Sequence, residues 1–267
     1  MAVKIILSDI DGTFLRKDKS VPKMHEKALK EILAQGIEFA FVSARMPEAI
    51  YPITDGIKLP HTAVISYSGA MVLTADEKIL YDKKMLLEDT KNILSAMENG
   101  WKNISINYYT GRKWYVRKID ERVQYEIKIT QATAEIAEFE DLIAKNILPN
   151  KILIMCEPPT CEEMESKLSA QFPKLNVVRS APHLLEIMDK TVSKATGIEV
   201  LLKHYGFSVD EAIAFGDNYN DIEMLEYIPQ SVTMGNAPEK ILQIANNVTD
   251  TSEVGGIFTY LKKIGLI

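Results

Sequence analysis

The sequence of 267 residues has little cysteine, no long apolar run and no excess of positive charge. Cys156 and Cys161 are the only cysteines, too few for a disulfide framework, and their scarcity favours a reducing compartment. Apolar stretches such as Ala63–Ser66 and Lys151–Cys156 are strand-sized, whereas a membrane helix needs roughly 18 residues or more. Acids interrupt the apolar run at the N-terminus from Asp9 onward, so we expect no signal peptide.

Positive charge is outnumbered, with 31 Lys and Arg against 37 Asp and Glu and a formal net charge of −6. Clustered cations drive sequence-independent binding to nucleic acids, so we expect no nucleic-acid partner. Hydrophobic residues make up 46% and charged residues 25%, which is typical of globular proteins and excludes disordered, collagen-like and coiled-coil chains. We expect a cytoplasmic protein of one or two domains with no membrane partner.

Strand-like and helix-like segments alternate at both ends of the chain. In the first part, strands are expected at Val3–Ser8, Ile37–Val42 and Ala63–Ser66, and helices at Pro22–Gln35 and from Pro47. After Asp189, a helix is expected over Lys194–Tyr205, strands over Ala212–Phe215 and Ser231–Met234, and a helix from Pro238. This alternation predicts an α/β fold, a Rossmann-like parallel-sheet core with helices on both faces.

The middle of the chain has a different pattern, with paired strands and separate helices. Hairpins are expected from Ala70–Leu73 with Lys78–Lys83, Ser105–Tyr109 with Lys113–Arg117, and Asn176–Ser180 with His183–Met188. Helices are expected over Glu88–Asn99 and, from a capping box of Thr160 and Glu163, up to Phe172, with a strand at Lys151–Cys156. We therefore expect a core from residues 1–83 and 188–267, and an inserted α+β module with an antiparallel sheet at 84–187.

Two acidic motifs directly follow expected strands. Asp9-Ile10-Asp11-Gly12-Thr13 follows the first strand, and Gly216-Asp217-Asn218-Tyr219-Asn220-Asp221 follows Ala212–Phe215. Each motif alone is compatible with a polar turn or a helix cap. Together they place four carboxylates at the edge of the sheet where ligands of open α/β folds bind. At an effective dielectric constant of about 20, each close pair repels by about 3–4 kcal/mol, which favours a magnesium site.

A serine after the second expected strand and a lysine at the start of a later helix are further candidates for the site. Ser43-Ala44-Arg45 follows the second strand, where a hydroxyl and backbone N–H groups are able either to hold a phosphate oxygen or to cap a helix. Lys194 stands at the start of a helix, where a cation opposes the helix dipole and is favourable only beside an anion. The alternative for Lys194 is a solvated surface position.

In this order and context the motifs resemble those of the haloacid dehalogenase (HAD) superfamily of phosphohydrolases, and more narrowly its Cof-type sugar-phosphatase branch. Its D-x-D-G-T motif is matched by Asp9–Thr13, its second-motif hydroxyl by Ser43, its lysine by Lys194, and its G-D-x-x-N-D motif by Gly216–Asp221. Met234-Gly235-Asn236-Ala237 and Glu253-Val254-Gly255-Gly256 also look like this branch.

The chain departs from the family pattern at three places. Ser43-Ala44-Arg45 replaces the frequent T-G-R, Ser68-Gly69-Ala70 replaces Asn-Gly-Ala, and Lys194-Ala195 replaces Lys-Gly. These departures remove no reacting group, so they bear on the fit of the substrate more than on catalysis.

The resemblance implies a Mg²⁺-dependent phosphatase that hydrolyses small phosphorylated metabolites, expected to be sugar phosphates, through an aspartyl-phosphate intermediate. Asp9 would be the nucleophile and Asp11 the general acid and base. Mg²⁺ would be bound by the carboxylates of Asp9 and Asp217 and by the backbone carbonyl of Asp11, with Asp221 supporting its water shell. The phosphoryl oxygens would be held by the backbone N–H of Ile10 and by the side chains of Ser43, Lys194 and Asn220.

The inserted module would then act as a cap that excludes water and sets the choice of substrate. Candidate specificity residues around its hairpins are Arg112, Lys113, Trp114 and Glu186, each of which is also compatible with an ordinary packing or surface role. Two alternative functions remain open, although the pair of Asp9 and Asp11 followed by a large insertion argues against the second. A phosphomutase would pass the phosphoryl group to a second hydroxyl instead of water, and a non-enzymatic phospho-Asp switch would keep it for hours.

Overall fold

The computed structural model describes residues 2–267 and divides them into two compact units. The core unit contains the chain up to Arg45 together with Ile50–Tyr81 and Ser193–Ile267, and the insert unit contains Met46–Ala49 and Asp82–Val192. The module predicted at 84–187 lies within the insert unit. Within residues 2–267, no helix combines the length and the apolar character needed to cross a membrane.

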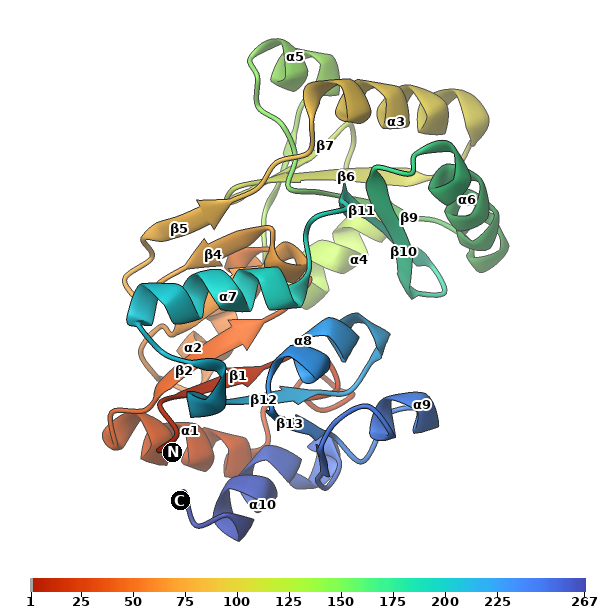
Figure 1. The fold of residues 1–267 in the computed structure, drawn as a ribbon. Coiled ribbons are helices and arrows are strands. Elements are labelled where there is room, and N and C mark those ends of the chain that lie inside the picture. The colour runs from red at the N-terminus through yellow and green to blue at the C-terminus, as the bar shows by residue number, and fades with distance from the viewer. Residues whose placement is uncertain (1) are drawn as a thin grey trace. The chain divides into compact units, whose positions relative to one another are not determined.

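The core unit is built on a sheet in the order β14-β13-β12-β1-β2-β3-β4-β5 (Figure 1). The strands from β14 to β3 are parallel, and β4 is antiparallel to β3. Their bounds are β1 Ile5–Ser8, β2 Glu38–Val42, β3 Ala63–Ser66, β4 Met71–Leu73, β5 Ile79–Asp82, β12 Ala212–Gly216, β13 Gln230–Thr233 and β14 Asn247–Val248. Ser8 is paired with Phe215, so the two acidic motifs leave neighbouring strands at the same edge.

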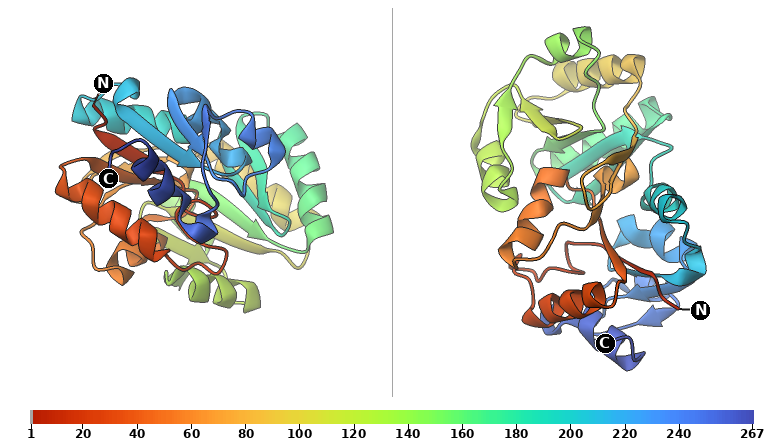
Figure 2. Two further views of the ribbon diagram at one scale, coloured as in Figure 1. Left: turned by 90° about the horizontal axis from the view of Figure 1, so that it is seen from below. Right: turned by 90° about the vertical axis from the view of Figure 1, so that its left-hand side faces the viewer.

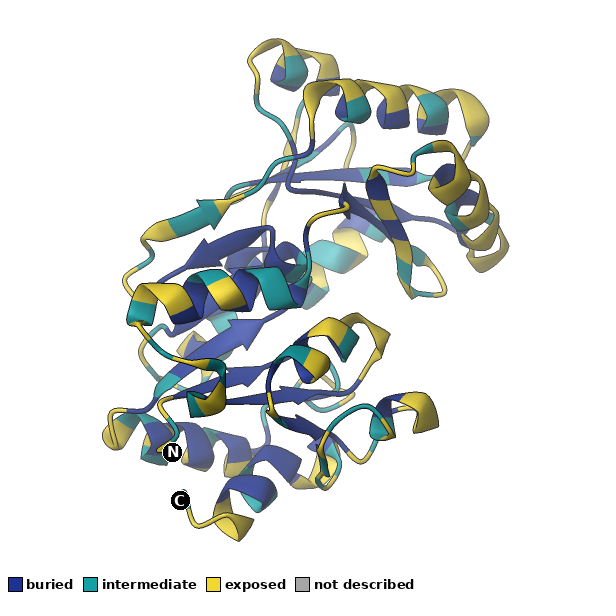
Figure 3. Ribbon diagram, in the orientation of Figure 1, coloured by how far each residue is buried: buried dark blue, intermediate teal, exposed yellow. Residues whose placement is uncertain are grey.

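Helices cover both faces of this sheet, which explains why the central strands β1 and β12 are largely apolar and are buried along their length (Figure 3). On one face, α1 (Lys23–Ala34) contacts β2 and lies beside α10 (Gly256–Lys263), as Figure 2 shows. On the other face, α7 (Lys194–Tyr205) and α8 (Ile222–Tyr227) pack on the sheet. The short helices α2 (Tyr51–Gly56) and α9 (Glu239–Leu242) complete the unit. The predicted α/β fold with a parallel-sheet core is confirmed.

The insert unit is an α+β structure with a sheet in the order β10-β11-β9-β6-β7-β8. The pairing is antiparallel except between β7 and β8. The strands are β6 Ser105–Thr110, β7 Lys113–Val116, β8 Ala134–Ile136, β9 Lys151–Met155, β10 Leu175–Ala181 and β11 Leu184–Asp189. The helices are α3 Leu87–Gly100, α4 Glu121–Thr130, α5 Phe139–Ala144 and α6 Pro158–Gln171, of which α3, α5 and α6 contribute to one apolar core with the sheet.

One local sequence prediction in this unit was wrong, and another lost its support. The capping box of Thr160 and Glu163 does not form, because α6 starts earlier, at Pro158, with Glu157 as its N-cap residue. Proline suits the first turn of a helix, where its missing N–H group is not needed, so the Pro158-Pro159 pair moves the start of the helix upstream. Cys156 and Cys161 form a disulfide within the buried core of the unit. The scarcity of cysteine predicts a reducing compartment, and this pairing removes that support.

His25 on α1 connects the loop after β1 to the C-terminal helix. The ring is fully buried; its Nε2 accepts the backbone N–H of Ile257 (3.2 Å), so its Nδ1 carries the proton and donates to the carbonyl oxygen of Phe14 (2.8 Å). Burial lowers the pKa of His25 to about 4, although the backbone hydrogen bonds partly oppose this effect. The neutral ring therefore holds the loop that carries the first acidic motif.

This depressed pKa makes stability depend on pH in a defined window. The stabilisation is complete above the ordinary histidine pKa of 6.5 and is lost as the pH falls toward 4, because only the unfolded chain binds the proton in that range. We expect the free energy of unfolding to fall by about 3 kcal/mol between pH 7 and pH 4 through this residue. Denaturant unfolding should show a weaker pH dependence for His25→Gln, and an unchanged one for His183→Gln, which alters an exposed histidine. Equal pH dependence in all three proteins would contradict the assignment.

Candidate active site

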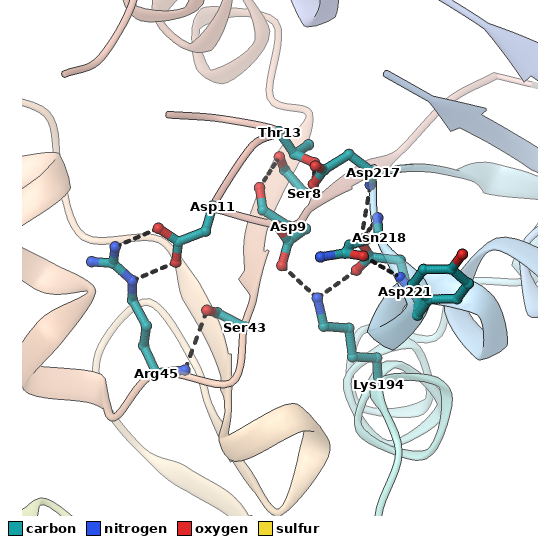
Figure 4. A network of polar contacts seen from close by, with 11 residues as sticks. Ser8, Asp9, Asp11, Thr13, Ser43, Arg45, Lys194, Asp217, Asn218 and Asp221 are labelled. Carbon is teal, nitrogen blue, oxygen red and sulfur yellow. Dashed lines mark hydrogen bonds and ion pairs between the residues drawn. The ribbon is translucent and has the colours of Figure 1, made fainter. Parts of the chain in front are cut away.

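The two acidic motifs meet at the carboxyl ends of β1 and β12 (Figure 4). The N–H of Asp9 still donates to the carbonyl oxygen of Phe215 (2.9 Å), so this residue is held by the sheet itself. Gly12 turns the chain with a φ of +90°, and a Cβ atom at this position would lie 2.3 Å from Oδ2 of Asp217. Glycine is therefore required for the first motif to approach the second this closely.

Three carboxylates and one ammonium group form the centre of the site. One ligand oxygen from each of Asp9, Asp217 and Asp221 lies within 4.8 Å of the others, and all three residues are buried. The Nζ atom of Lys194 donates to Oδ1 of Asp9 and to Oδ1 of Asp221. With all groups ionised, this buried cluster carries two negative charges in excess.

Burial and the excess of negative charge both act on the ionisation of these acids. Burial raises the pKa of Asp9 well above its ordinary value, and the carboxylates of Asp221 and Asp217 raise it further while Lys194 opposes them. Burial and the nearby Asp221 raise the pKa of Asp217 to about 6. Burial tends to lower the pKa of Lys194, but Asp221 and Asp9 outweigh it, so the pKa is raised and the lysine stays charged. The cluster is thus short of positive charge.

Lys194 reaches the acids because the start of α7 is fixed by two local features. Ser193 and Thr196 form a capping box, which begins the helix at Lys194. The loop after β3 packs against this end of the helix at Gly69, whose φ is +107° and where a Cβ atom would lie 1.9 Å from the carbonyl oxygen of Ser193. The side chain of Lys194 is fully buried between two anions, so the alternative of a solvated surface lysine is excluded.

Asp11 does not join the buried cluster with its carboxylate. Arg45 binds it in a bidentate manner, with Nε 2.8 Å from Oδ2 and one terminal nitrogen 2.7 Å from Oδ1, and Lys19 adds a contact of 2.7 Å to Oδ1. Burial would raise the pKa of Asp11, but the two cations dominate and hold it well below its ordinary range. Asp11 is therefore a carboxylate in this arrangement.

The other residues predicted for the site occupy different environments. Ser43 is buried at the end of β2, where its Oγ accepts the backbone N–H of Arg45 (3.2 Å). Ile10 is buried, and its carbonyl oxygen accepts N–H groups of the following turn. Asn220 lies in the turn Tyr219–Asp221 with an exposed side chain, outside the contacts of the acid cluster.

Asp221 has a structural role in addition to its place in the cluster. Its Oδ2 accepts the backbone N–H groups of Asp217 and Asn218, each at 2.9 Å, and closes a capping box with Asn218. The helix-cap interpretation of the second motif is therefore correct for Asp221, and it coexists with the contact to Lys194. The same carboxylate fixes the backbone that carries Asp217.

The four candidate specificity residues of the insert unit all have partners within that unit. Arg112 pairs with Glu48, and Lys113 pairs with Glu135. Trp114 is buried and donates from Nε1 to Oδ1 of Asn107 (3.0 Å), and Glu186 is buried 3.7 Å from Nζ of Lys151. Their role in choosing a substrate stays a prediction.

Sequence reasoning assigned no role to two residues that hold Asp217. The hydroxyl of Thr13 donates to Oδ1 of Asp217 (2.8 Å), and Nδ2 of Asn236 donates to Oδ2 (3.1 Å). Asn236 belongs to the segment Met234-Gly235-Asn236-Ala237, which in the sequence shows only a resemblance to a family pattern. No spacing rule connects Asn236 with Asp217, so the contact becomes visible only in the folded chain.

The donor set of this cluster fits a hard divalent cation. Mg²⁺ prefers oxygen ligands and is commonly bound by one or two carboxylates together with water and substrate phosphate. Asp9, Asp217 and Asp221 supply such oxygens, and a charge of +2 would balance the excess of two negative charges in the cluster. Soft ligands are missing from it, because its members are carboxylates and not thiolates or imidazoles.

Comparisons with known proteins point to one family. Residues 6–261 match the family model described as haloacid dehalogenase-like hydrolase. A putative phosphatase from Haemophilus influenzae is 32% identical over 264 residues, covering 98% of both chains. Among solved structures, a haloacid dehalogenase-like hydrolase from Bacteroides thetaiotaomicron superposes with a TM-score of 0.87 at 26% identity, over 98% of this chain and 99% of the other. A structure described as a HAD subclass IIB sugar phosphatase gives a TM-score of 0.85 at 24% identity, over 99% and 100%.

Proposed function

This chain belongs to the haloacid dehalogenase-like hydrolases, and on that premise we propose that it is a Mg²⁺-dependent phosphatase of small phosphorylated metabolites. The strongest support is the buried cluster of three carboxylates and one lysine. With all groups ionised, the cluster has two negative charges in excess. A bound Mg²⁺ would supply the missing charge and neutralise the phosphate as it approaches. Asp9 and Asp217 would hold the ion with their carboxylates and Asp11 with its backbone carbonyl, while Asp221 would support the water around it.

In the proposed first step, an Oδ atom of Asp9 attacks the phosphorus of the substrate. An O–P bond forms to Asp9 and the P–O bond to the leaving alcohol breaks, which yields an aspartyl-phosphate. The backbone hydrogen bond to Phe215 fixes the start of the Asp9 side chain, and Lys194 favours the ionised carboxylate needed for attack. Phosphoryl transfer depends mainly on such positioning and on charge neutralisation.

Asp11 would move the protons in both steps. In its acid form it gives a proton to the departing alkoxide, and in the second step it takes a proton from the water that attacks the phosphorus. That attack breaks the bond to Asp9 and releases inorganic phosphate. The contacts of Asp11 with Arg45 and Lys19 favour the carboxylate, the form that acts as base, so the acid role requires these contacts to loosen when substrate is bound.

The phosphoryl oxygens would be held by Ser43, Lys194, Asn220 and the backbone N–H of Ile10. Ser43 and Lys194 are both buried at the sheet edge beside Asp9, which supports their part in this set. We infer that the substrate is a sugar phosphate, whose sugar hydroxyl is the leaving group. The insert unit would be the cap that sets substrate specificity. The similarity of fold to a structure described as a sugar phosphatase supports that choice.

Chelation tests the metal dependence directly. Treatment with excess EDTA is expected to abolish phosphate release from a panel of sugar phosphates without unfolding the protein, and added Mg²⁺ should restore the rate. Circular dichroism on the same samples checks the fold. Full activity in excess chelator would contradict a metal-dependent mechanism, and an isomerised product without released phosphate would favour a phosphomutase.

A further inference from the structure

Asn236 lies in the turn between β13 and α9 and connects three loops through one amide group. Its Nδ2 donates to the carbonyl oxygen of Gly12 (2.9 Å) and to Oδ2 of Asp217 (3.1 Å). Its Oδ1 accepts the backbone N–H of Ser252 (2.9 Å). The partners belong to the turn after β1, the turn after β12 and the segment before α10, so Asn236 links both acidic motifs to the C-terminal part of the core unit.

The Asp217 carboxylate is held from two sides. Thr13 donates to Oδ1 and Asn236 donates to Oδ2, so a rotation of the carboxylate would break at least one hydrogen bond. Neither donor carries a charge, so the pair orients the Asp217 carboxylate without neutralising its negative charge. Partners of this kind, which contact a ligand residue but not the ion, are known to tune metal sites.

The C-terminal segment gives Asn236 a rigid support. A Cβ atom on Gly235 would lie 2.9 Å from the carbonyl oxygen of Thr249, and one on Gly256 would lie 2.1 Å from that of Asp250. The N–H of Gly235 also donates to the carbonyl oxygen of Asp250 (3.2 Å). The turn and the segment are therefore in direct backbone contact, and the N–H of Ser252 is fixed where the Asn236 amide needs it.

We propose that Asn236 is a positioning residue for the metal site, which holds the Asp217 carboxylate in the orientation that binds Mg²⁺. This inference rests on the proposed function, because it assigns Asp217 as a ligand. The hydrogen bonds of the Asn236 side chain go to Gly12, Asp217 and Ser252 and not to the proposed nucleophile Asp9, so we expect its effect on the affinity for the ion and not on the chemical steps.

The test is the affinity of the substrate-free protein for Mg²⁺, measured by isothermal titration calorimetry. Asn236→Ala is expected to raise the dissociation constant by about 10–100-fold, the range seen when the supporting partner of a metal ligand is removed. At saturating Mg²⁺ its kcat should return to within a few fold of the original protein. The matched control is Asn246→Ala, which removes a side-chain hydrogen bond to the carbonyl oxygen of Pro229 (2.8 Å) in the same part of the core unit and should leave the affinity unchanged.

The outcomes separate this inference from the proposed function. If the unaltered protein does not bind Mg²⁺, or if Asp217→Asn binds it as tightly, the proposed function fails. If the unaltered protein binds Mg²⁺ and folded Asn236→Ala binds it within two-fold as tightly, the positioning role alone is overturned. Should the alanine variant not fold, Asn236→Leu, which keeps the side-chain volume, decides in the same way. If both variants unfold, Asn236 is required for folding, and this result would also contradict the proposal.

Discussion

The Asp9→Asn protein is expected to release phosphate at least about 10⁴-fold more slowly than the unaltered protein and to stay folded. An amide oxygen is a poor nucleophile, and the substitution also removes one of the three carboxylates proposed to balance Mg²⁺. The fold should not suffer, because Lys194 keeps its contact with Asp221 and one negative charge leaves a crowded buried cluster. Steady-state phosphate release and thermal unfolding measured on the same preparation check both parts.

The matched control for this variant is Asp210→Asn, which makes the same chemical change at an exposed position of the core unit. It should leave both the rate and the unfolding temperature unchanged. Near-normal turnover of Asp9→Asn would show that the covalent mechanism assigned to this residue is wrong. A strong loss of stability would instead show that Asp9 is needed to hold Lys194 in place.

For Asp11→Asn we expect a loss of about 10²–10⁴ in rate, which corresponds to about 3–5 kcal/mol of barrier. Its carboxylate accepts hydrogen bonds from Arg45 and Lys19 and is not part of the buried carboxylate cluster. The affinity for Mg²⁺ should therefore change little. The loss should be greatest for alkyl phosphates, whose leaving alkoxide needs a proton. Nitrophenyl phosphate should lose less in the first step, since its phenolate leaves without one.

A pre-steady-state burst of nitrophenolate from Asp11→Asn would show that the first step survives while hydrolysis of the intermediate has slowed. The control is Asp18→Asn, which alters an exposed acid of the same loop whose carboxylate accepts hydrogen bonds from Ser20, and it should behave like the unaltered protein. Equal losses for both substrates, with no burst, would remove the acid–base role from Asp11.

The sequence was sufficient to predict helices and strands where capping residues and apolar segments gave clear local signals. The helix expected at Lys194–Tyr205 has those bounds in the structure, because Ser193 caps its start and Gly206 adopts the left-handed conformation that ends it. The short central strands were recognisable because burial under helices on both faces favours largely apolar sequences. From their order, the meeting of the two acidic motifs at one sheet edge followed directly.

Where the local signal is weak, the same reasoning failed. Residues 118–150 hold α4, β8 and α5, none of which was predicted. In α4 the buried positions are Val123 and Thr130, and in β8 only Ala134 is buried, so neither element has a clear apolar period. Their packing depends on neighbouring elements and not on their own sequence.

The polar contacts around the site were also beyond local sequence reasoning. Asn236 is separated from Gly12 by 224 residues and Thr13 from Asp217 by 204 residues, so only the folded sheet brings them together. The ion pair of Asp11 with Arg45 likewise depends on the closeness of the loops after β1 and β2. Sequence motifs identified the acids, whereas the residues that orient them required the three-dimensional arrangement.

The most direct test of the central claim is to trap the phosphorylated enzyme and locate the modified residue. A nitrophenyl phosphate reaction with Asp11→Asn, quenched in acid within the first turnover, should yield a protein heavier by one phosphoryl group. Peptide mass spectrometry after borohydride reduction should place the modification on Asp9. A covalent phosphoryl group on any other residue, or rapid turnover with no phosphorylated protein at any quench time, would contradict the mechanism.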